Sequence, residues 1–148
     1  MGSEGREPRT MDAAEGWIVV DAQVADVYQR WLAFEEFPKF ITVIKSVRKV
    51  DDNHFVAVLE FDGKQNEVIL EMMLRVPQRR VAWRTLANHH VPEQLAAGVV
   101  LFRSISEQST CITFKLTSTF GGAIAKRVDE YLRNFKLLLE EEHRKATD

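Results

Sequence analysis

The stretch VADVYQRWLAFEEFPKFI, residues 24–41, contains two helical patterns in immediate succession. Its first half, Val24 to Leu32, spaces apolar side chains three and four residues apart, which is typical of one buried helical face. Its second half, Phe34 to Phe40, includes Pro38, which can sit in a first turn or end a helix but disrupts a helix interior. We therefore predict two short helices that meet at a bend and close one end of the fold. The aromatic side chains expected to turn inward are Trp31, Phe34, Phe37 and Phe40.

Strand patterns lie on both sides of this helical pair. A short β-branched run at residues 16–22 precedes it, and alternation with a period of two residues follows it. Asp62-Gly63 is a typical hairpin turn between two alternating segments. We expect about six strands after the helices, and their short connections favour antiparallel neighbours. The alternating segments are residues 54–61, 67–76, 80–86, 97–106 and 110–118.

The C-terminal segment returns to a helical pattern. From Ala123 onward, apolar residues recur at three- and four-residue intervals over several turns. This helix alone is long enough to cover a sheet whose strands alternate between a wet face and a covered face. The pattern predicts an α+β fold, in which an antiparallel sheet of about seven strands wraps around the long C-terminal helix. The apolar stripe consists of Ile124, Val128, Tyr131, Leu132, Phe135, Leu138 and Leu139.

Composition excludes several classes of protein. The chain has 148 residues and a formal net charge of −2, with its 20 basic residues spread along it, so we expect no nucleic-acid partner. No apolar run reaches the ~18 residues needed to span a bilayer, and the first residues lack the apolar core of a signal peptide. The single cysteine, Cys111, fits a reducing cytoplasm. We expect a flexible extension at residues 1–12 and a single cytoplasmic domain at residues 13–148.

Four segments of the chain form recognisable motifs. They are VDAQVADVYQRWLAFEEFPKFI at residues 20–41, RRVAWRT at residues 79–85, GVVLF at residues 98–102 and NFKLLLE at residues 134–140. Together they resemble the polyketide cyclase/dehydrase family of the START-like, or helix-grip, superfamily, which includes the birch pollen allergen, and the first is similar to the opening signature of that family. The resemblance implies a helix-grip fold, in which a curved antiparallel sheet leaves an apolar cavity between itself and the C-terminal helix. It implies a shared cavity more securely than a shared reaction.

The alternation predicts which side chains line this cavity. The inward rows contain no Asp, Glu, His, Lys or Arg, and their polar groups are the hydroxyls of Thr85, Ser104 and Tyr131. Leu74 belongs to the same rows, whereas a register slip of one residue would turn Arg75 inward instead. The side chains expected to contact a ligand are Ala57, Leu59, Met72, Trp83, Thr85, Val100, Phe102, Phe114, Tyr131 and Phe135.

We expect neither a metal site nor a cofactor. His89 and His90 are adjacent in an extended loop, so their side chains point apart. No third Asp, Glu, His or Cys lies at a spacing typical of metal ligands.

The inward rows favour binding or transport of a small hydrophobic molecule, such as a lipid, an isoprenoid or a polyketide-like aromatic. The resemblance implies an alternative, a polyketide aromatase/cyclase or dehydratase acting on an acyl-carrier-bound chain, with Tyr131 and Arg103 as candidate groups. Acid–base catalysis needs a titratable group near the reacting proton, which the inward rows lack, so a binder is favoured over an enzyme. A third hypothesis is an adaptor without a ligand, which predicts an exposed apolar patch at Phe34 to Ile41 for a protein partner.

Overall fold

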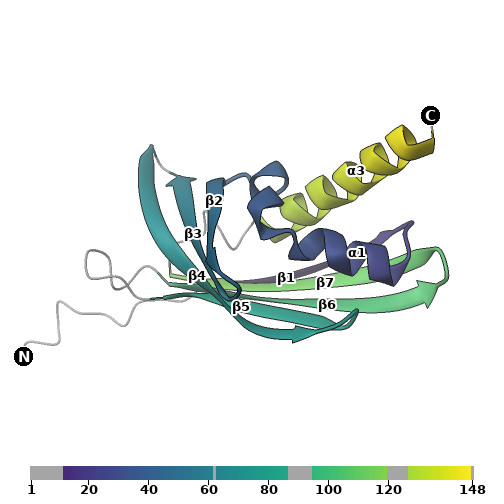
Figure 1. Cartoon of the computed structure of the whole chain (residues 1–148), viewed down its shortest axis with the longest axis horizontal. Coiled ribbons are helices and arrows are strands. Elements are labelled where there is room, and N and C mark those ends of the chain that lie inside the picture. The colour runs from purple at the N-terminus through teal and green to yellow at the C-terminus, as the bar shows by residue number, and fades with distance from the viewer. Residues whose placement is uncertain (1–11, 62, 87–94, 120–126, 148) are drawn as a thin grey trace, which may run out of the picture.

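The computed structural model describes residues 12–61, 63–86, 95–119 and 127–147 (Figure 1). The predicted extension lies outside these residues except for Asp12, and so do the predicted helix start at Ala123 and the pair His89 and His90. The described elements, in chain order, are β1 (Asp12–Val20), α1 (Val24–Leu32), η1 (Phe34–Lys39), β2 (Ile44–Asp51), β3 (His54–Phe61), β4 (Lys64–Val76), β5 (Arg80–Leu86), β6 (Ala96–Ser106), β7 (Ser109–Ser118) and α3 (Val128–Thr147).

The seven strands form one antiparallel sheet in the order β1-β7-β6-β5-β4-β3-β2. Strands β2 to β7 each lie beside the next strand in sequence, as expected for short connections. After β1 the chain passes through α1 and η1 to the far edge of the sheet, where β2 begins. Figure 1 shows the sheet curling upward at β2, β3 and β4, with α1, η1 and α3 on its concave face. The predicted helix-grip architecture is confirmed.

Helix α1 and the 3-10 helix η1 form the predicted helical pair. Pro38 lies inside η1, and the chain leaves the helix where the N–H of Phe40 donates to the carbonyl of Phe37 at 3.0 Å. The side-chain amide of Asn134 in α3 donates to the carbonyl of Phe40 at 3.2 Å, which ties the end of η1 to the long helix. The buried side chains of α1 are Val27, Tyr28 and Trp31.

Trp31 lies at the centre of an aromatic cluster that joins the helices to the sheet. Its ring is fully buried, and the neighbouring rings pack against it mostly edge-on, which is a favourable arrangement for aromatic pairs. The predicted inward side chains of the helical pair are all buried, so they fill the interior and leave no exposed apolar patch for an adaptor. The centroid distances from Trp31 are 4.8 Å to Phe135, 5.0 Å to Phe40, 5.3 Å to Phe114, 6.2 Å to Phe37 and 6.4 Å to Phe102.

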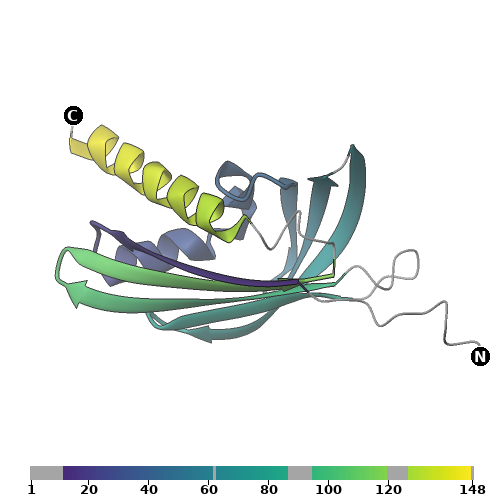
Figure 2. The ribbon, with the colours of Figure 1, turned by 180° about the vertical axis from the view of Figure 1, so that it is seen from behind.

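Helix α3 approaches the sheet closely only near its start. A β-carbon at Gly16 in β1 would overlap the side chain of Asp129 and lie 3.1 Å from that of Val128, so the absence of a side chain at this position allows the close packing. Toward its C-terminus the helix rises away from the sheet (Figures 1 and 2). Leu137 is 61% exposed, whereas its neighbours Leu138 and Leu139 are partly buried and pack against the core.

We expected about six strands after the helices, but the alternating pattern located only five of them. The structure shows that the remaining strand is β2. This strand is at the edge of the sheet and pairs only with β3. Its Lys45, Arg48 and Lys49 are exposed, as is common for edge strands, and these charges interrupt the apolar alternation.

A β-bulge in β4 makes one sequence prediction wrong. Met72 pairs with Trp83, but the next pair joins Leu74 to Ala82, so β4 has one extra residue. Leu74 is therefore 38% exposed, and Arg75 turns to the concave side. Alternation cannot reveal such an inserted residue.

Ser104, also predicted to face inward, is exposed. It lies near the β6–β7 turn, where its hydroxyl donates to the carbonyl of Ser106 at 3.1 Å. The predicted row is correct for the central part of β6 but continues past the covered part of the strand.

Candidate ligand-binding site

Two small voids lie in the interior on either side of Trp83. The larger has a volume of about 40 Å³ and the smaller about 10 Å³. Trp83, Phe37 and Leu70 border both voids, so these three side chains separate them. The other residues around the larger void are Ile41, Val43, Ile44, Leu59, Val68, Thr85, Ala96, Phe114 and Leu116, and those around the smaller are Phe34, Phe55 and Met72.

The side chains predicted to contact a ligand are all buried, but they fall into two groups. One group borders a void and consists of Leu59, Trp83, Thr85 and Phe114 at the larger void and Met72 at the smaller. The other group is packed in the core without bordering either void and consists of Ala57, Val100, Phe102, Tyr131 and Phe135.

One wall of the larger void was missed at the sequence level. Phe37, Ile41, Val43 and Ile44 all border it, and they belong to one continuous stretch from η1 to the start of β2. The apolar residues that follow directly after Phe40 are the signal that could have revealed this wall. The charged residues of β2 obscured it.

The hydroxyl of Thr85 is already used by the sheet. Its Oγ1 accepts the N–H of Ala96 at 2.8 Å and donates to the carbonyl of the same residue at 3.3 Å. The side chain therefore links the end of β5 to the start of β6, and its hydroxyl is occupied.

Three other buried polar atoms have no hydrogen-bond partner within the described part of the chain. They are the indole Nε1 atoms of Trp31 and Trp83 and the hydroxyl of Tyr131. Burial raises the pKa of Tyr131 to about 12, so its phenol is a proton donor at neutral pH and cannot serve as a base. Buried indole and phenol groups usually find a partner, so these three atoms each leave a hydrogen bond unmet in the interior.

Arg75 is exposed and Tyr28 is buried against Phe102, and neither borders a void. The guanidinium of Arg75 donates to the carbonyl of Asp52 at 2.6 Å and to Oδ1 of Asn53 at 2.9 Å, so it holds the β2–β3 turn. Burial raises the pKa of Tyr28, and the charge of Arg75 partly opposes this effect. The arginine that the bulge turns to the concave side therefore stabilises the β2–β3 turn.

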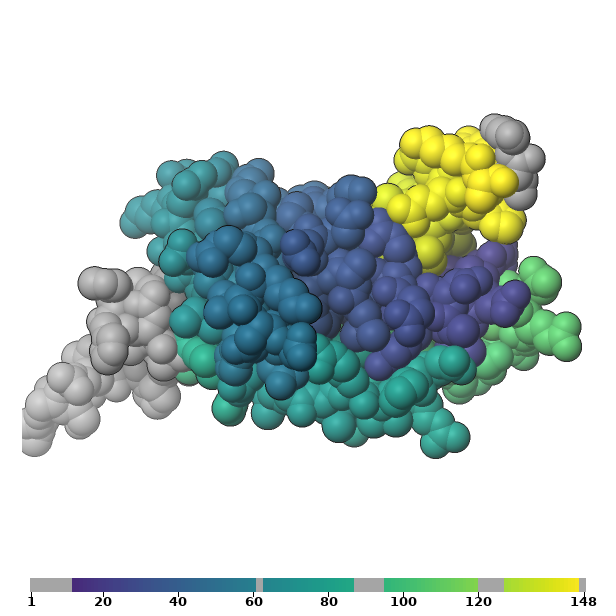
Figure 3. Space-filling model, in the orientation of Figure 1, coloured from purple at the N-terminus to yellow at the C-terminus, as the bar shows by residue number. Residues whose placement is uncertain are grey.

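The larger hollows of the molecule are open clefts with charged walls. One of about 650 Å³ separates α1 from the second half of α3, which stands clear of the rest of the molecule in Figure 3. Arg30 closes one end of this cleft, because its Nε and Nη2 donate to the two carboxylate oxygens of Glu142 at 2.9 and 3.1 Å. Charged, water-filled clefts of this kind are poor sites for an apolar ligand.

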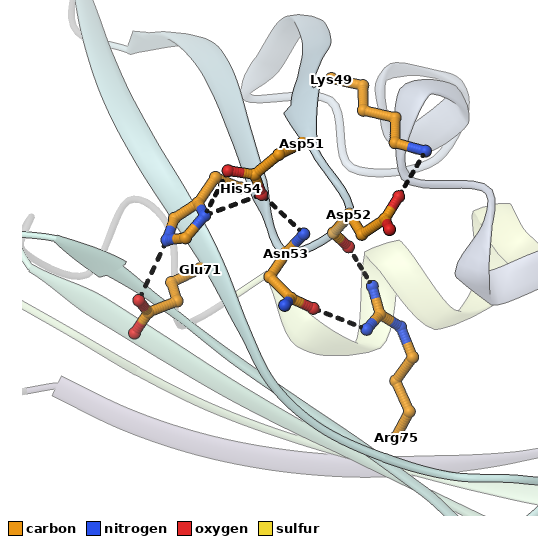
Figure 4. A network of polar contacts seen from close by, with 7 residues as sticks. All are labelled: Lys49, Asp51, Asp52, Asn53, His54, Glu71 and Arg75. Carbon is orange, nitrogen blue, oxygen red and sulfur yellow. Dashed lines mark hydrogen bonds and ion pairs between the residues drawn. The ribbon is translucent and has the colours of Figure 1, made fainter.

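A polar network joins β2, β3 and β4 away from the voids (Figure 4). His54 Nδ1 lies 2.8 Å from Oδ1 of Asp51, and its Nε2 lies 3.1 Å from Oε2 of Glu71. These two hydrogen bonds raise the pKa of His54, and the bond to Asp51 has the larger effect. Arg84, followed by His54, lowers the pKa of Glu71 by hydrogen bonding. The network contains no nucleophile beside the histidine, and we interpret it as a link between strands.

Two further properties concern the described residues only. None of their helices is long and apolar enough to cross a membrane. They also contain no group of three His, Cys, Asp or Glu side chains placed to hold a metal ion.

The curved sheet, the helical pair and the apolar interior beneath them define a START-like helix-grip fold. The family model described as polyketide cyclase / dehydrase and lipid transport matches residues 20–134, and the chain belongs to this family. A 17.2 kDa protein of Streptomyces lincolnensis is 27% identical over 141 residues, which cover 88% of this chain and 91% of that protein.

Solved structures agree with the fold. A START superfamily protein from Mycobacterium smegmatis has a TM-score of 0.67 at 14% identity and covers 90% of this chain and 98% of its own. An aromatase/cyclase from Streptomyces sp. R1128 has a TM-score of 0.61 at 15% identity and covers 89% of this chain and 86% of its own. At such identities the likeness concerns the fold alone.

Proposed function

We propose that this protein binds a small hydrophobic molecule in the space between η1 and strands β2 to β7. The chemistry of the larger void is the observation that carries the proposal, because no ionisable side chain is among its described neighbours. Its two polar side chains are Thr85, whose hydroxyl is occupied, and Trp83. An apolar ligand placed there would gain about 25 cal/mol for each Å² removed from water and would desolvate no charge.

Binding requires one wall to move. A volume of about 40 Å³ holds little more than one water molecule, whereas ligand pockets usually measure roughly 300–1,000 Å³. The segment from Phe37 to Ile44 is the wall we expect to shift, because η1 is a short 3-10 helix and β2 is an edge strand. The opposite walls belong to interior strands that are paired on both sides. This segment would thus act as the gate to the interior.

Thermal unfolding with and without ethylbenzene tests this proposal. A ligand that binds only the folded state raises the unfolding temperature by mass action, so we expect a saturable rise for the native chain. Val68→Phe, in β4, fills the larger void and should abolish the rise in unfolding temperature. Val56→Phe, in β3 on the opposite face of the sheet, should retain it. An equal rise in both variants, or no rise in the native chain, would refute interior binding.

An aromatase/cyclase is the second candidate function. The family description includes cyclases, and the unpartnered hydroxyl of Tyr131 could orient a carbonyl of a folded poly-keto chain. Arg103, the other group suggested from sequence, is exposed and follows the inward Phe102 in β6, so it faces away from the interior. Conversion of a poly-β-keto thioester by the native chain, with its loss in Tyr131→Phe, would support this candidate over a simple binder.

A further inference from the structure

We propose that the convex face of the sheet binds the surface of an anionic lipid bilayer, through an exposed tryptophan and a group of arginines that lack counter-charges. The proposal goes beyond the proposed function and does not depend on it, because interior binding uses the opposite face of the sheet. Helices α1, η1 and α3 all lie on the concave side in Figures 1 and 2, so no described helix covers the convex face.

A row of side chains crosses this face from the edge at β1. Trp17 pairs with Thr113, and Thr113 pairs with Leu101. Leu101 in turn pairs with Arg80, so the row spans β1, β7, β6 and β5. Gly16 packs against α3, so the side chain of Trp17, the next residue, points to the convex side, where it is 68% exposed. Tryptophan is enriched where proteins meet the headgroup level of a membrane, because its ring is apolar and its N–H is polar.

Three exposed arginines lie beside Leu101 in this row. Arg80 is its partner in β5, Arg79 precedes Arg80, and Arg103 follows Leu101 by two residues in β6 and so lies on the same face. None of the three forms an ion pair within the described part of the chain, and neither does Glu107 in the β6–β7 turn. Grouped cations without counter-charges create a positive potential, which attracts an anionic partner.

Two of these arginines border one open cleft. Strand β6 continues beyond the end of β5, where the N–H of Phe102 donates to the carbonyl of Arg79 at 2.8 Å. The cleft at this step has a volume of about 520 Å³, and its walls include Arg79, Arg103, Ser104 and Leu101. Guanidinium groups match the geometry of phosphate oxygens, so the cleft suits a lipid phosphate. Leu101 belongs to both the row and the cleft, so the two form one surface.

Gln78 occupies the same cleft at an energetic cost. Its φ is 62°, in the left-handed region that favours glycine, within a turn in which the N–H of Arg79 donates to the carbonyl of Val76 at 2.9 Å. Strained residues of this kind cluster at functional sites. The side-chain amide of Gln78 adds a further hydrogen-bond donor to the walls of the cleft.

An anionic bilayer fits this surface better than a second copy of the chain. In a symmetric dimer the same patch meets itself, so Arg80 and Arg103 would approach cations of the partner. An acidic protein would neutralise the arginines but would not by itself require an exposed indole beside them. A bilayer offers phosphates for the arginines and apolar chains for Trp17 and Leu101, so it matches both parts of the surface.

Vesicle sedimentation with the full chain tests the proposal. The vesicles consist of phosphatidylcholine alone or of phosphatidylcholine with one quarter phosphatidylglycerol. Arg80→Gln with Arg103→Gln removes two charges from the patch, and its control, Lys45→Gln with Arg48→Gln, removes two from β2 at the opposite edge of the sheet. Trp17→Ser removes the indole, and its control is Leu137→Ser, at a side chain of α3 that is 61% exposed. The unfolding temperature of each variant verifies that it is folded.

We expect the native chain to bind the anionic vesicles, to ignore the neutral ones and to bind more weakly as the salt concentration rises. Each basic residue near such a surface contributes about fivefold in affinity, so the loss of Arg80 and Arg103 should weaken binding about thirtyfold. The loss of Lys45 and Arg48 should weaken it less than about fivefold, and Trp17→Ser should weaken it severalfold while Leu137→Ser should not.

Three results would overturn the proposal. The first is that the anionic vesicles do not bind, or bind no better than the neutral ones. The second is an equal loss in the two double variants, which would indicate a general effect of charge. The third is full binding by Trp17→Ser together with competition from polyglutamate as strong as that from vesicles, which would indicate an acidic protein partner. None of these results would affect the binding of ethylbenzene in the interior.

Discussion

The indole of Trp83 occupies the space above Gly98 that a β-carbon would take, across the pair formed by β5 and β6. Two consequences follow from this relationship. The glycine fixes where the tryptophan lies, and the tryptophan separates the two interior voids. The geometry of the site therefore depends on a residue that has no side chain.

Gly98→Ala should destabilise the protein by about 1–3 kcal/mol, because the new methyl group overlaps the Trp83 ring and forces it from its position. Urea unfolding measures this effect, and tryptophan fluorescence should report the displaced ring. Ala97→Ser, on the other face of the same strand, is the control and should stay within about 0.5 kcal/mol of the native chain. Equal stability of the two variants would contradict the packing described for Trp83.

Trp31→Ala should cost about 3–5 kcal/mol, because it removes the ring at the centre of the aromatic cluster. Trp17→Ala is the matched control, since Trp17 is 68% exposed and should change the free energy of unfolding by no more than about 0.5 kcal/mol. Chemical denaturation of both variants decides the matter. A small effect at Trp31 would show that η1 and α1 are not anchored as described.

Arg30→Met and Glu142→Gln, alone and combined, should show a coupling free energy of about 0.5–1 kcal/mol, toward the upper end for surface ion pairs because the contact is bidentate. Each single change should also speed amide hydrogen exchange in the second half of α3, where the helix has risen away from the sheet (Figure 2). Exchange that is unaffected in both variants would mean that the ion pair does not hold this part of the helix.

The pKa of His54 should lie above its usual value of 6.5, because Asp51 and Glu71 accept hydrogen bonds from its ring. When folding raises the pKa of a histidine, the protonated side chain stabilises the folded state. This stabilisation is complete at pH values below the pKa of the unfolded chain, and it is lost as the pH rises through the pKa of the folded chain. The free energy of unfolding should therefore decline from about pH 6.5 upward, and His54→Gln should lack this decline.

Glu71→Gln offers a direct check on the same network. It removes one carboxylate from the imidazole ring and should lower the pKa of His54, as followed by NMR of the ring protons. A His54 pKa that does not move would contradict the hydrogen bond drawn in Figure 4.

The regular parts of the fold could be predicted because they follow local periodicity. Helix α1 has the bounds expected from the spacing of its apolar residues, Val24 to Leu32. Ala57 and Leu59 in β3 and Trp83 and Thr85 in β5 were also predicted correctly to face inward, because each strand keeps its period of two. The motifs that resemble the family added the curvature of the sheet, which periodicity does not specify.

The remaining features depend on contacts between distant segments. The bulge beside Leu74 arises from the pairing of β4 with β5, and the β4 sequence gives no sign of it. The hydroxyl of Thr85 was expected to be available to a ligand, but it completes the link to Ala96 across the sheet. The small size of the voids follows from how side chains of α1, η1 and the sheet interlock, and a list of inward residues does not specify this.

The most direct test of interior binding is the indole region of the ¹H–¹⁵N NMR spectrum during a titration with acetophenone. The chain has three tryptophans, so the region contains three indole signals: Trp17 on the surface, Trp31 in the core and Trp83 at the voids. We predict a saturable shift of the Trp83 signal, because its ring borders both voids, with the Trp17 signal unchanged. A titration in which the Trp83 signal stays in place, or in which only Trp17 moves, would contradict the account.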